Sequence, residues 1–116
     1  MTDPLIDPEA WNTFKSMMDP GFLDEMIDVY LSDAPMLIEQ MHSGLAKGDF
    51  ELVRRAAHSL KSNSANLGAD RLTTATRELE MIAKGNTLEG AGPKLAQVEK
   101  EYAQLCPALE ALKNGQ

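Results

Sequence analysis

The chain has 116 residues, of which 43% are hydrophobic and 25% are charged, so a single domain around one packed core is expected. Eleven Lys and Arg residues against 18 Asp and Glu residues give a net charge of -7. This balance argues against general nucleic-acid binding, because the neutralisation of phosphates needs a basic surface.

The sequence favours neither secretion nor insertion into a membrane. The first 20 residues are acidic and lack the basic segment and the apolar run of a secretory signal. No apolar stretch approaches the roughly 20 residues that span a bilayer. One cysteine, Cys106, excludes an intramolecular disulfide and a thiolate zinc cluster. Together these features predict a reduced, cytoplasmic setting.

A short helix and then a long one are predicted in the first half of the chain. The short helix carries Trp11 and Phe14 and is expected to cover one end of the domain. The long helix has Asp19 at its N-cap and ends at Gly48, and Pro35 should bend it without ending it. Its apolar positions recur at steps of three and four, at Leu23, Ile27, Tyr30, Ala34, Leu37, Met41 and Leu45.

Three further helices are predicted in the second half. Asp49 caps the first of them, which stops at Gly68, and the next ends at Gly85 and Asn86. Pro107 should kink the last one. The three apolar stripes are Phe50, Val53, Ala57, Leu60, Ser64 and Leu67, then Leu72, Ala75, Leu79 and Ile82, then Leu95, Val98, Tyr102, Leu105, Leu109 and Leu112.

The connections between these helices are short, so neighbouring helices must run antiparallel. The fold class expected is therefore all-α, an antiparallel up-and-down four-helix bundle with a short accessory N-terminal helix. We expect residues 1–116 to form one domain of a free-standing protein that is a monomer.

Two histidines are the side chains expected to titrate near neutral pH. His42 has no acidic or histidine partner four residues further along its helix, which is typical of an ordinary surface histidine. His58 lies roughly 140° from Val53 on a helical wheel, on the solvent side. Arg54 and Lys61 lie on the same face as His58, and small residues follow one turn later.

An exposed imidazole beside basic residues favours an anion over a metal ion, because Arg54 and Lys61 would repel a cation. The unprotonated ring nitrogen of His58 can attack a phosphoryl group. Nearby cations favour the neutral, nucleophilic ring and stabilise the charge of the product. Lys61, one turn after His58, is the best placed of these cations. A plain solvated basic face is the alternative interpretation of the same pattern.

The segment from Ala56 to Gly68, AAHSLKSNSANLG, resembles the signature of the histidine-containing phosphotransfer (HPt) domain, roughly A-H-x-L-K-G followed by small residues and L-G. The resemblance covers nearly the whole chain. Upstream, YLSDAP at 30–35 and GDF at 48–50 are similar to the first long helix of the family and the turn after it. Downstream, Leu79 and Glu80 match the usual family position.

This resemblance implies a phosphorelay intermediate. His58 would accept a phosphoryl group from an aspartyl phosphate on a receiver domain and pass it to another receiver. Lys61 would hold and neutralise the phosphoryl oxygens, and Gly68 would end the active helix. The implied partners are receiver domains of response regulators or hybrid histidine kinases. Members of the family lack kinase activity, and the receiver supplies the magnesium site, so no cofactor or metal is expected on this chain.

The same resemblance and the helical wheel together predict the docking surface, with one departure from the family pattern. Ser62 stands where the family usually has glycine, and its hydroxymethyl group could crowd the partner or donate a hydrogen bond to the phosphoryl group. Glu80 and Lys84, four residues apart, are expected to form a weak flanking ion pair. The residues predicted to contact the partner are Arg54, Arg55, Ser62, Ala65, Asn66 and Gly68.

Two other functions stay open from the sequence alone. One is an HPt-like binding protein that no longer transfers phosphate, although the presence of both His58 and Lys61 argues against it. The other is a helical adaptor that binds an amphipathic partner segment in a methionine-bearing groove. The methionines in question are Met17, Met18, Met26, Met36, Met41 and Met81.

The charges are unevenly distributed along the chain. Residues 1–45 carry nine acids and one base, residues 46–77 carry six bases and three acids, and residues 78–116 carry four bases and six acids. The only basic segment of this acidic chain therefore contains His58. Since receiver domains present an acidic pocket, this segment is expected to steer their approach.

Overall fold

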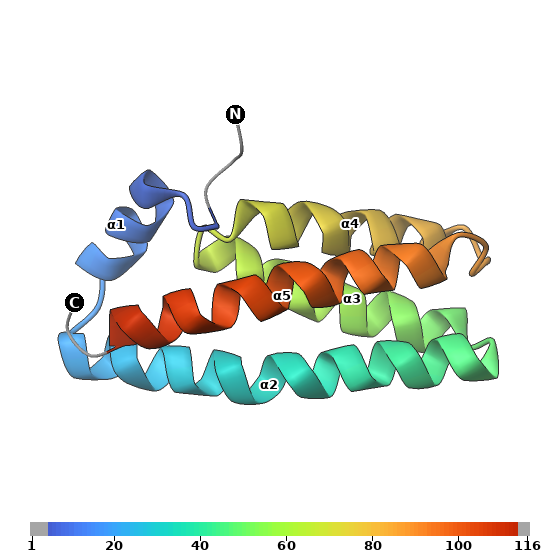
Figure 1. Ribbon diagram of the computed structural model, residues 1–116, viewed down its shortest axis with the longest axis horizontal. Coiled ribbons are helices and arrows are strands. Elements are labelled where there is room, and N and C mark those ends of the chain that lie inside the picture. The colour runs from blue at the N-terminus through green and yellow to red at the C-terminus, as the bar shows by residue number, and fades with distance from the viewer. Residues whose placement is uncertain (1–4, 114–116) are drawn as a thin grey trace.

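Residues 5–113, which the computed structural model describes, form five helices and no strand. Their bounds are α1 (Pro8–Ser16), α2 (Pro20–Lys47), α3 (Phe50–Asn66), α4 (Asp70–Lys84) and α5 (Ala91–Lys113). Helices α2 to α5 run alternately up and down the bundle, and α1 crosses one end of it (Figure 1). The predicted antiparallel bundle with an accessory N-terminal helix is confirmed.

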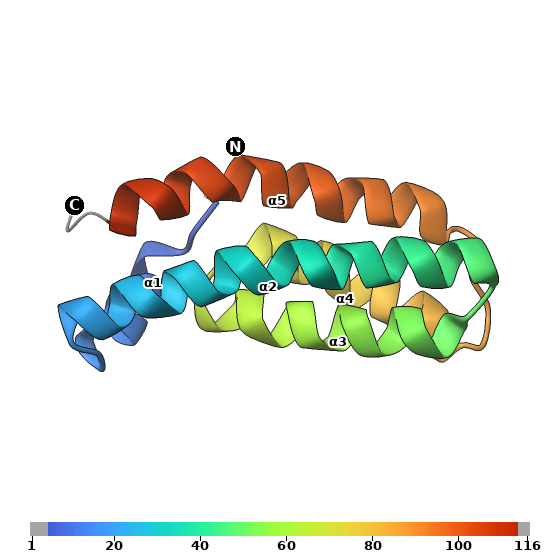
Figure 2. The same ribbon diagram turned by 90° about the horizontal axis from the view of Figure 1, so that it is seen from below.

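Each long helix packs against two neighbours. Helix α2 lies between α5 and α3, as Figure 2 shows, and α4 closes the bundle against α3 and α5. The predicted stripes face inward almost throughout, but in α2 Ile38 is buried where Leu37 was expected, because the step after Ala34 is four residues and not three. Ser64 takes a core position since its Oγ lies 2.8 Å from the buried Tyr30 hydroxyl.

The helix ends follow the sequence with one exception. The Asp49 carboxylate accepts a hydrogen bond from the Leu52 amide at 3.1 Å and so caps α3. Gly48 ends α2 in the left-handed conformation, at φ 72°. Asp19 stands at the N-cap of α2, but its side chain makes no capping hydrogen bond. The predicted side-chain cap at Asp19 is therefore wrong.

Pro35 lies inside α2 without ending it, as predicted. Proline has no amide hydrogen, so the carbonyl of Leu31, four residues earlier, loses its usual helical donor. The hydroxyl of Tyr102 on α5 donates a long hydrogen bond to that carbonyl, at 3.4 Å. Burial raises the pKa of Tyr102, which keeps this hydroxyl a donor. The same interaction ties α5 to α2.

Gly44 in α2 allows a close approach of α3. A Cβ atom at this position would lie 2.7 Å from Cγ2 of Val53 and 3.0 Å from the Asp49 carbonyl oxygen. We expect Gly44→Ala to lower the free energy of unfolding by about 1–3 kcal/mol, as overpacking does, despite the better helix propensity of Ala. Urea denaturation measures the change.

Gly92, in the first turn of α5, is the matched control for Gly44, because a Cβ atom there meets nothing within 4 Å. Gly92→Ala should leave the free energy of unfolding unchanged or slightly higher. Equal stabilities of the two variants would contradict the close contact between α2 and α3.

Candidate functional site

His58 lies in the middle of α3, on the side turned away from the core. Ala57 and Leu60 beside it are fully buried, whereas the His58 side chain is 58% exposed. The apolar spacing of α3 thus turns the imidazole to the surface, as the helical wheel predicts.

A carboxylate from the neighbouring helix holds both His58 and Lys61. One oxygen of Glu80 lies 2.8 Å from Nδ1 of His58, and the other lies 2.6 Å from Nζ of Lys61. The Glu80 side chain belongs to α4 and is only 7% exposed. Because an ionised carboxylate only accepts hydrogen bonds, Nδ1 carries the ring proton of the neutral tautomer. The lone pair of Nε2 is then free to react.

The predicted pairing of Glu80 with Lys84 is wrong. Both carboxylate oxygens of Glu80 face α3, and no ion pair joins Glu80 to Lys84 within the part of the chain that the structure describes. Spacing along α4 predicts Lys84 as the partner because it is four residues away, but Glu80 binds His58 and Lys61 on the adjacent helix α3 instead. Lys84 is exposed at the end of α4.

Glu80 stays ionised although it is nearly buried. Burial acts to raise the pKa of its carboxyl, but hydrogen bonds from Lys61 and His58 and the charges of both outweigh this effect. The pKa of Glu80 is therefore held below its ordinary value of 4.5. The ionised form is the one that orients the ring of His58.

The depressed pKa of Glu80 makes its contribution to stability depend on pH. Above about pH 4.5 the unfolded and folded chains are both ionised at this group, and the contribution is fully present. As the pH falls through the lower folded pKa, the carboxylate takes up a proton and the contribution is lost. The difference in free energy of unfolding between the chain and Glu80→Gln should be constant above pH 5 and shrink below about pH 4.

Urea denaturation of both proteins at several pH values measures this difference. Glu89→Gln is the control, since Glu89 lies on the surface between α4 and α5. A difference for Glu80→Gln that stays constant, or grows, towards low pH would contradict the role of the ionised carboxylate.

The predicted docking residues on α3 lie at the surface, whereas Gly68, in the turn after α3, does not. Ser62, Ala65 and Asn66 are exposed one or two turns after His58. The two arginines before His58 are paired with Glu51 of the same helix: Nε of Arg54 lies 3.0 Å from Oε1, and Nε of Arg55 lies 3.9 Å from Oε2. Contact of these five residues with a partner remains a prediction.

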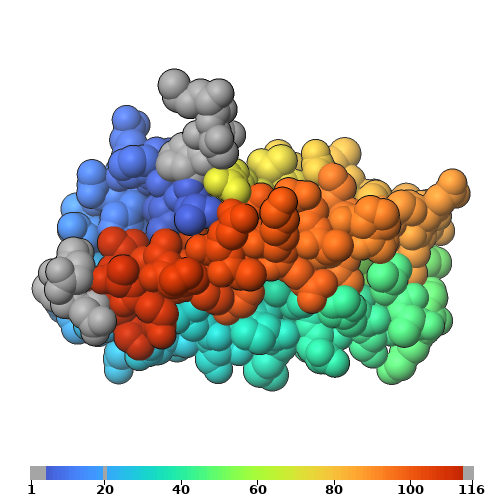
Figure 3. Space-filling model, in the orientation of Figure 1, coloured from blue at the N-terminus to red at the C-terminus, as the bar shows by residue number. Residues whose placement is uncertain are grey.

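Gly68 is the exception, because it is buried beneath α1. Its carbonyl accepts a hydrogen bond from the Asp7 amide at 2.7 Å, and a Cβ atom on it would lie 2.9 Å from Cβ of Ala10. In Figure 3, α1 lies over this end of the bundle. Gly68 follows α3 with φ at 78°, so its predicted role in ending the helix is confirmed. Its predicted contact with a partner is wrong.

His42 is a surface histidine, as predicted. It lies where α2 meets α5, whereas His58 lies where α3 meets α4. Its Nε2 is 3.0 Å from a carboxylate oxygen of Glu99 on α5, and the two side chains are 48% and 45% exposed. A search along the same helix misses this partner because Glu99 comes from another helix. The reactive Nε2 of His42 is thus engaged, while Glu80 engages only Nδ1 of His58.

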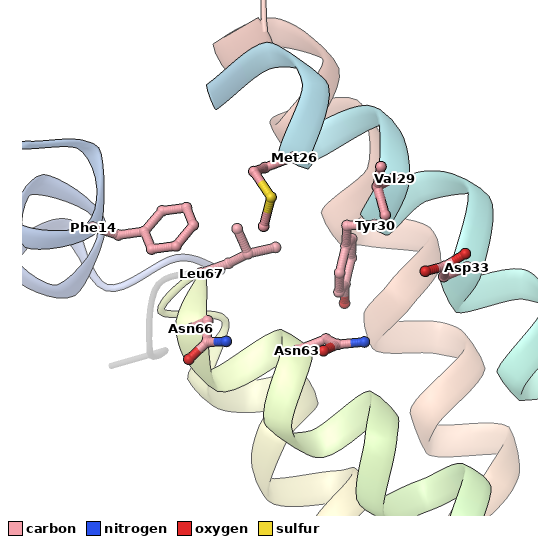
Figure 4. Close-up of a pocket in the computed structure, with 8 residues that line it drawn as sticks. All are labelled: Phe14, Met26, Val29, Tyr30, Asp33, Asn63, Asn66 and Leu67. Atoms are coloured by element: carbon pink, nitrogen blue, oxygen red, sulfur yellow. The ribbon is translucent and has the colours of Figure 1, made fainter. Parts of the chain in front are cut away.

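A pocket of about 110 Å³ lies among α1, α2 and α3 (Figure 4). Figure 4 shows its side chains converging from these three helices, with Asn63 and Asn66 on the α3 side. Met26 lines this pocket, whereas Met41 is in the core and Met81 is exposed on α4. The methionines therefore do not gather into the single groove that an adaptor would need. The remaining lining residues are Phe14, Val29, Tyr30, Asp33 and Leu67.

Residues 5–113 lack the features of two other classes of site. Nowhere in this range do three or more His, Cys, Asp or Glu side chains come together as metal ligands could. Within the same range, every helix is too short or too polar to cross a membrane.

Comparison with known proteins decides the family. The sequence model of the Hpt domain matches residues 25–112, which is most of the chain. The chain belongs to the HPt family. The matched range contains His58, Lys61 and Glu80, and it excludes α1.

Individual HPt proteins agree with this assignment. Histidine-containing phosphotransfer protein 2 of Arabidopsis thaliana is 30% identical over 112 residues, which cover 91% of this chain and 72% of that protein. The crystal structure of histidine-containing phosphotransfer protein B from Pseudomonas aeruginosa superposes with a TM-score of 0.91 at 25% identity and covers 99% of both chains. The crystal structure of a histidine-containing phosphotransfer protein from maize shares the fold alone: at 24% identity it has a TM-score of 0.82 and the match covers 92% of this chain and 81% of that one.

The function of this HPt domain follows from its family. It is a phosphorelay intermediate in two-component signalling, and HPt proteins work with receiver domains and histidine kinases. Among the residues of the candidate site, the sequence did not predict that Glu80 binds His58 and Lys61. The only signal for it was that Leu79 and Glu80 match the usual family position.

Proposed function

We propose that His58 is the phosphoacceptor of this relay. It takes a phosphoryl group from an aspartyl phosphate on a receiver domain and passes it to the aspartate of another receiver. One observation carries this proposal: Glu80 binds Nδ1 at 2.8 Å, while the side chain of His58 is 58% exposed, which leaves Nε2 available for reaction. A nucleophile that is oriented on one side and open on the other suits in-line transfer.

The chemical step uses Nε2 of His58. Its lone pair attacks phosphorus, the bond between phosphorus and the aspartyl oxygen breaks, and the receiver's carboxylate leaves. The ring gains positive charge, which the Glu80 carboxylate beside Nδ1 stabilises. Lys61, 26% exposed, can turn its ammonium from Glu80 to the phosphoryl oxygens. Attack by an aspartate of a second receiver reverses the step.

The surface of this chain on which a receiver docks is centred on His58. Small side chains at Ser62 and Ala65 leave room for the receiver's loops, and Arg54, Arg55 and Asn66 form the rim. This is the basic part of an acidic chain, so an acidic receiver pocket is attracted to it at low salt. The proposed partners are receiver domains of response regulators and hybrid histidine kinases.

Four further properties belong to the same proposal. The chain acts as a monomer, in the cytoplasm, and has no kinase activity of its own. Magnesium belongs to the acidic pocket of the receiver, because Lys61 and Arg54 beside His58 disfavour a cation on this chain. The presence of a single proposed acceptor histidine supports the monomer, and the single cysteine supports a reduced, cytoplasmic setting.

Transfer from a phosphorylated receiver tests the proposal. A receiver carrying labelled aspartyl phosphate is mixed with the chain, and label should appear on the chain in an acid-labile, alkali-stable form, as a phosphoramidate requires. An adaptor or an inactive HPt-like protein would bind the receiver without taking label. The absence of transfer from every receiver encoded in the same organism would contradict the proposal.

A further inference from the structure

The charges around His58 are already balanced before a phosphoryl group arrives. The ammonium of Lys61 is matched by the carboxylate of Glu80, at 2.6 Å. A phosphoryl group on a side chain adds about 1.5 to 2 negative charges near neutral pH. Even with the positive charge that the ring of His58 gains, the phosphorylated site carries a net negative charge, so a further cation beside Lys61 would stabilise it.

Arg54 is placed to supply that cation. It precedes His58 by four residues of α3, so their Cβ atoms are about 5–6 Å apart on one face of the helix. A guanidinium offers two parallel donors that match phosphoryl oxygens. In the unphosphorylated chain Glu51 occupies these donors, with Nε of Arg54 3.0 Å from Oε1. The Glu51 side chain is 54% exposed, so this ion pair is weak and can exchange.

We propose that Arg54 leaves Glu51 for the phosphoryl group when His58 is phosphorylated, and thereby raises the share of phosphoryl groups that His58 holds at equilibrium with a receiver. This inference rests on the proposed function of His58. The electrostatics agree with the geometry: the hydrogen bond to Glu51 raises the pKa of Arg54, and the charge of Glu80 raises it further. The guanidinium is thus within electrostatic reach of the carboxylate that binds His58 and Lys61.

Arg55 is the matched control for Arg54 in an equilibrium measurement, because both lie on the proposed rim of the docking surface and a docking contact changes the rate of transfer, not the equilibrium between the free proteins. Arg55 precedes His58 by three residues, but it lies on the other side of His58 from Lys61 by helical spacing. Its side chain is 67% exposed, against 33% for Arg54, and its Nε lies 3.9 Å from Oε2 of Glu51, too far for a hydrogen bond. Removal of either arginine changes the net charge equally. Only Arg54 has a guanidinium group that an ion pair with Glu51 already orders on the Lys61 side of His58.

Three variants test the exchange. Each is brought to equilibrium with a phosphorylated receiver, and the phosphorylated fraction of the chain is measured. Arg54→Ala should lower the equilibrium constant for transfer to His58 by about three- to tenfold, and Arg55→Ala by less than about twofold. Glu51→Gln, which frees Arg54, should raise it. In a ³¹P NMR titration, the pKa of the phosphoryl group should rise in Arg54→Ala and not in Arg55→Ala.

The possible outcomes separate this inference from the proposed function. Equal losses in Arg54→Ala and Arg55→Ala, or no gain in Glu51→Gln, overturn the exchange while His58 remains the acceptor. If the unaltered chain takes no phosphoryl group, the proposed function fails and the inference falls with it. Should Arg54→Ala not fold, Arg54→Lys replaces it. This variant should also lower the equilibrium constant for transfer to His58, because lysine keeps the positive charge but lacks the two parallel donors of a guanidinium group.

Discussion

His58→Gln is expected to abolish the transfer of phosphoryl groups to the chain. The amide of Gln has no basic nitrogen to attack phosphorus, yet it is polar and can still donate to Glu80, so the bundle should stay folded. Label from a phosphorylated receiver, followed on a denaturing gel, measures the loss, and circular dichroism checks the fold.

The second histidine provides the control for this result. His42→Gln should take label as fully as the unaltered chain, because His42 is paired with Glu99 between α2 and α5, away from the interface of α3 with α4. Label that persists in His58→Gln and disappears in His42→Gln would exclude His58 as the acceptor.

Gly68→Ala is expected to lower the free energy of unfolding by about 2–4 kcal/mol. A side chain at φ 78° costs roughly 1–2 kcal/mol, and the new Cβ atom would lie 2.9 Å from Cβ of Ala10 and 3.2 Å from the Asp7 carbonyl oxygen. The measurement is urea denaturation. The loss has two parts, one from the backbone and one from the packing of α1.

Gly48→Ala separates these two parts. Gly48 has a similar φ of 72°, but a Cβ atom there meets nothing within 4 Å. Its replacement should cost only the backbone part, roughly 1–2 kcal/mol. Equal losses at Gly48 and Gly68 would contradict the contact between α1 and the turn after α3.

Gly68 also matters for the site, although it lies outside it. The turn at Gly68 sends α4 back along α3, and this brings Glu80 opposite His58, 22 residues earlier in the chain. The position of the carboxylate that orients the imidazole therefore depends on the geometry of this turn.

The helices could be predicted from the sequence because the signals for them are local. Apolar spacing of three and four, glycines at 48 and 68, and the carboxylate of Asp49 act within one or two turns of helix. His58 was placed at the surface by the same spacing. A local signal can also fail: Asp19 has the right position for a cap and makes no capping hydrogen bond.

Contacts between helices could not be predicted in the same way. The wheel of α3 places Arg54 and Lys61 near His58, but it says nothing of Glu80, which arrives from α4. The burial of Gly68 depends on where α1 crosses the bundle, and the pairing of His42 depends on α5. Such contacts require the register between helices, which the spacing of apolar residues along one helix does not determine.

The most direct test of the central claim is to find which nitrogen carries the phosphoryl group. The chain, labelled with ¹⁵N, is phosphorylated by a receiver, and long-range ¹H–¹⁵N spectra of the histidine rings are recorded at alkaline pH. We expect the phosphoryl group on Nε2 of His58, with Nδ1 still bound to Glu80. A phosphoryl group on Nδ1 of His58, or on His42, would contradict the geometry of the site.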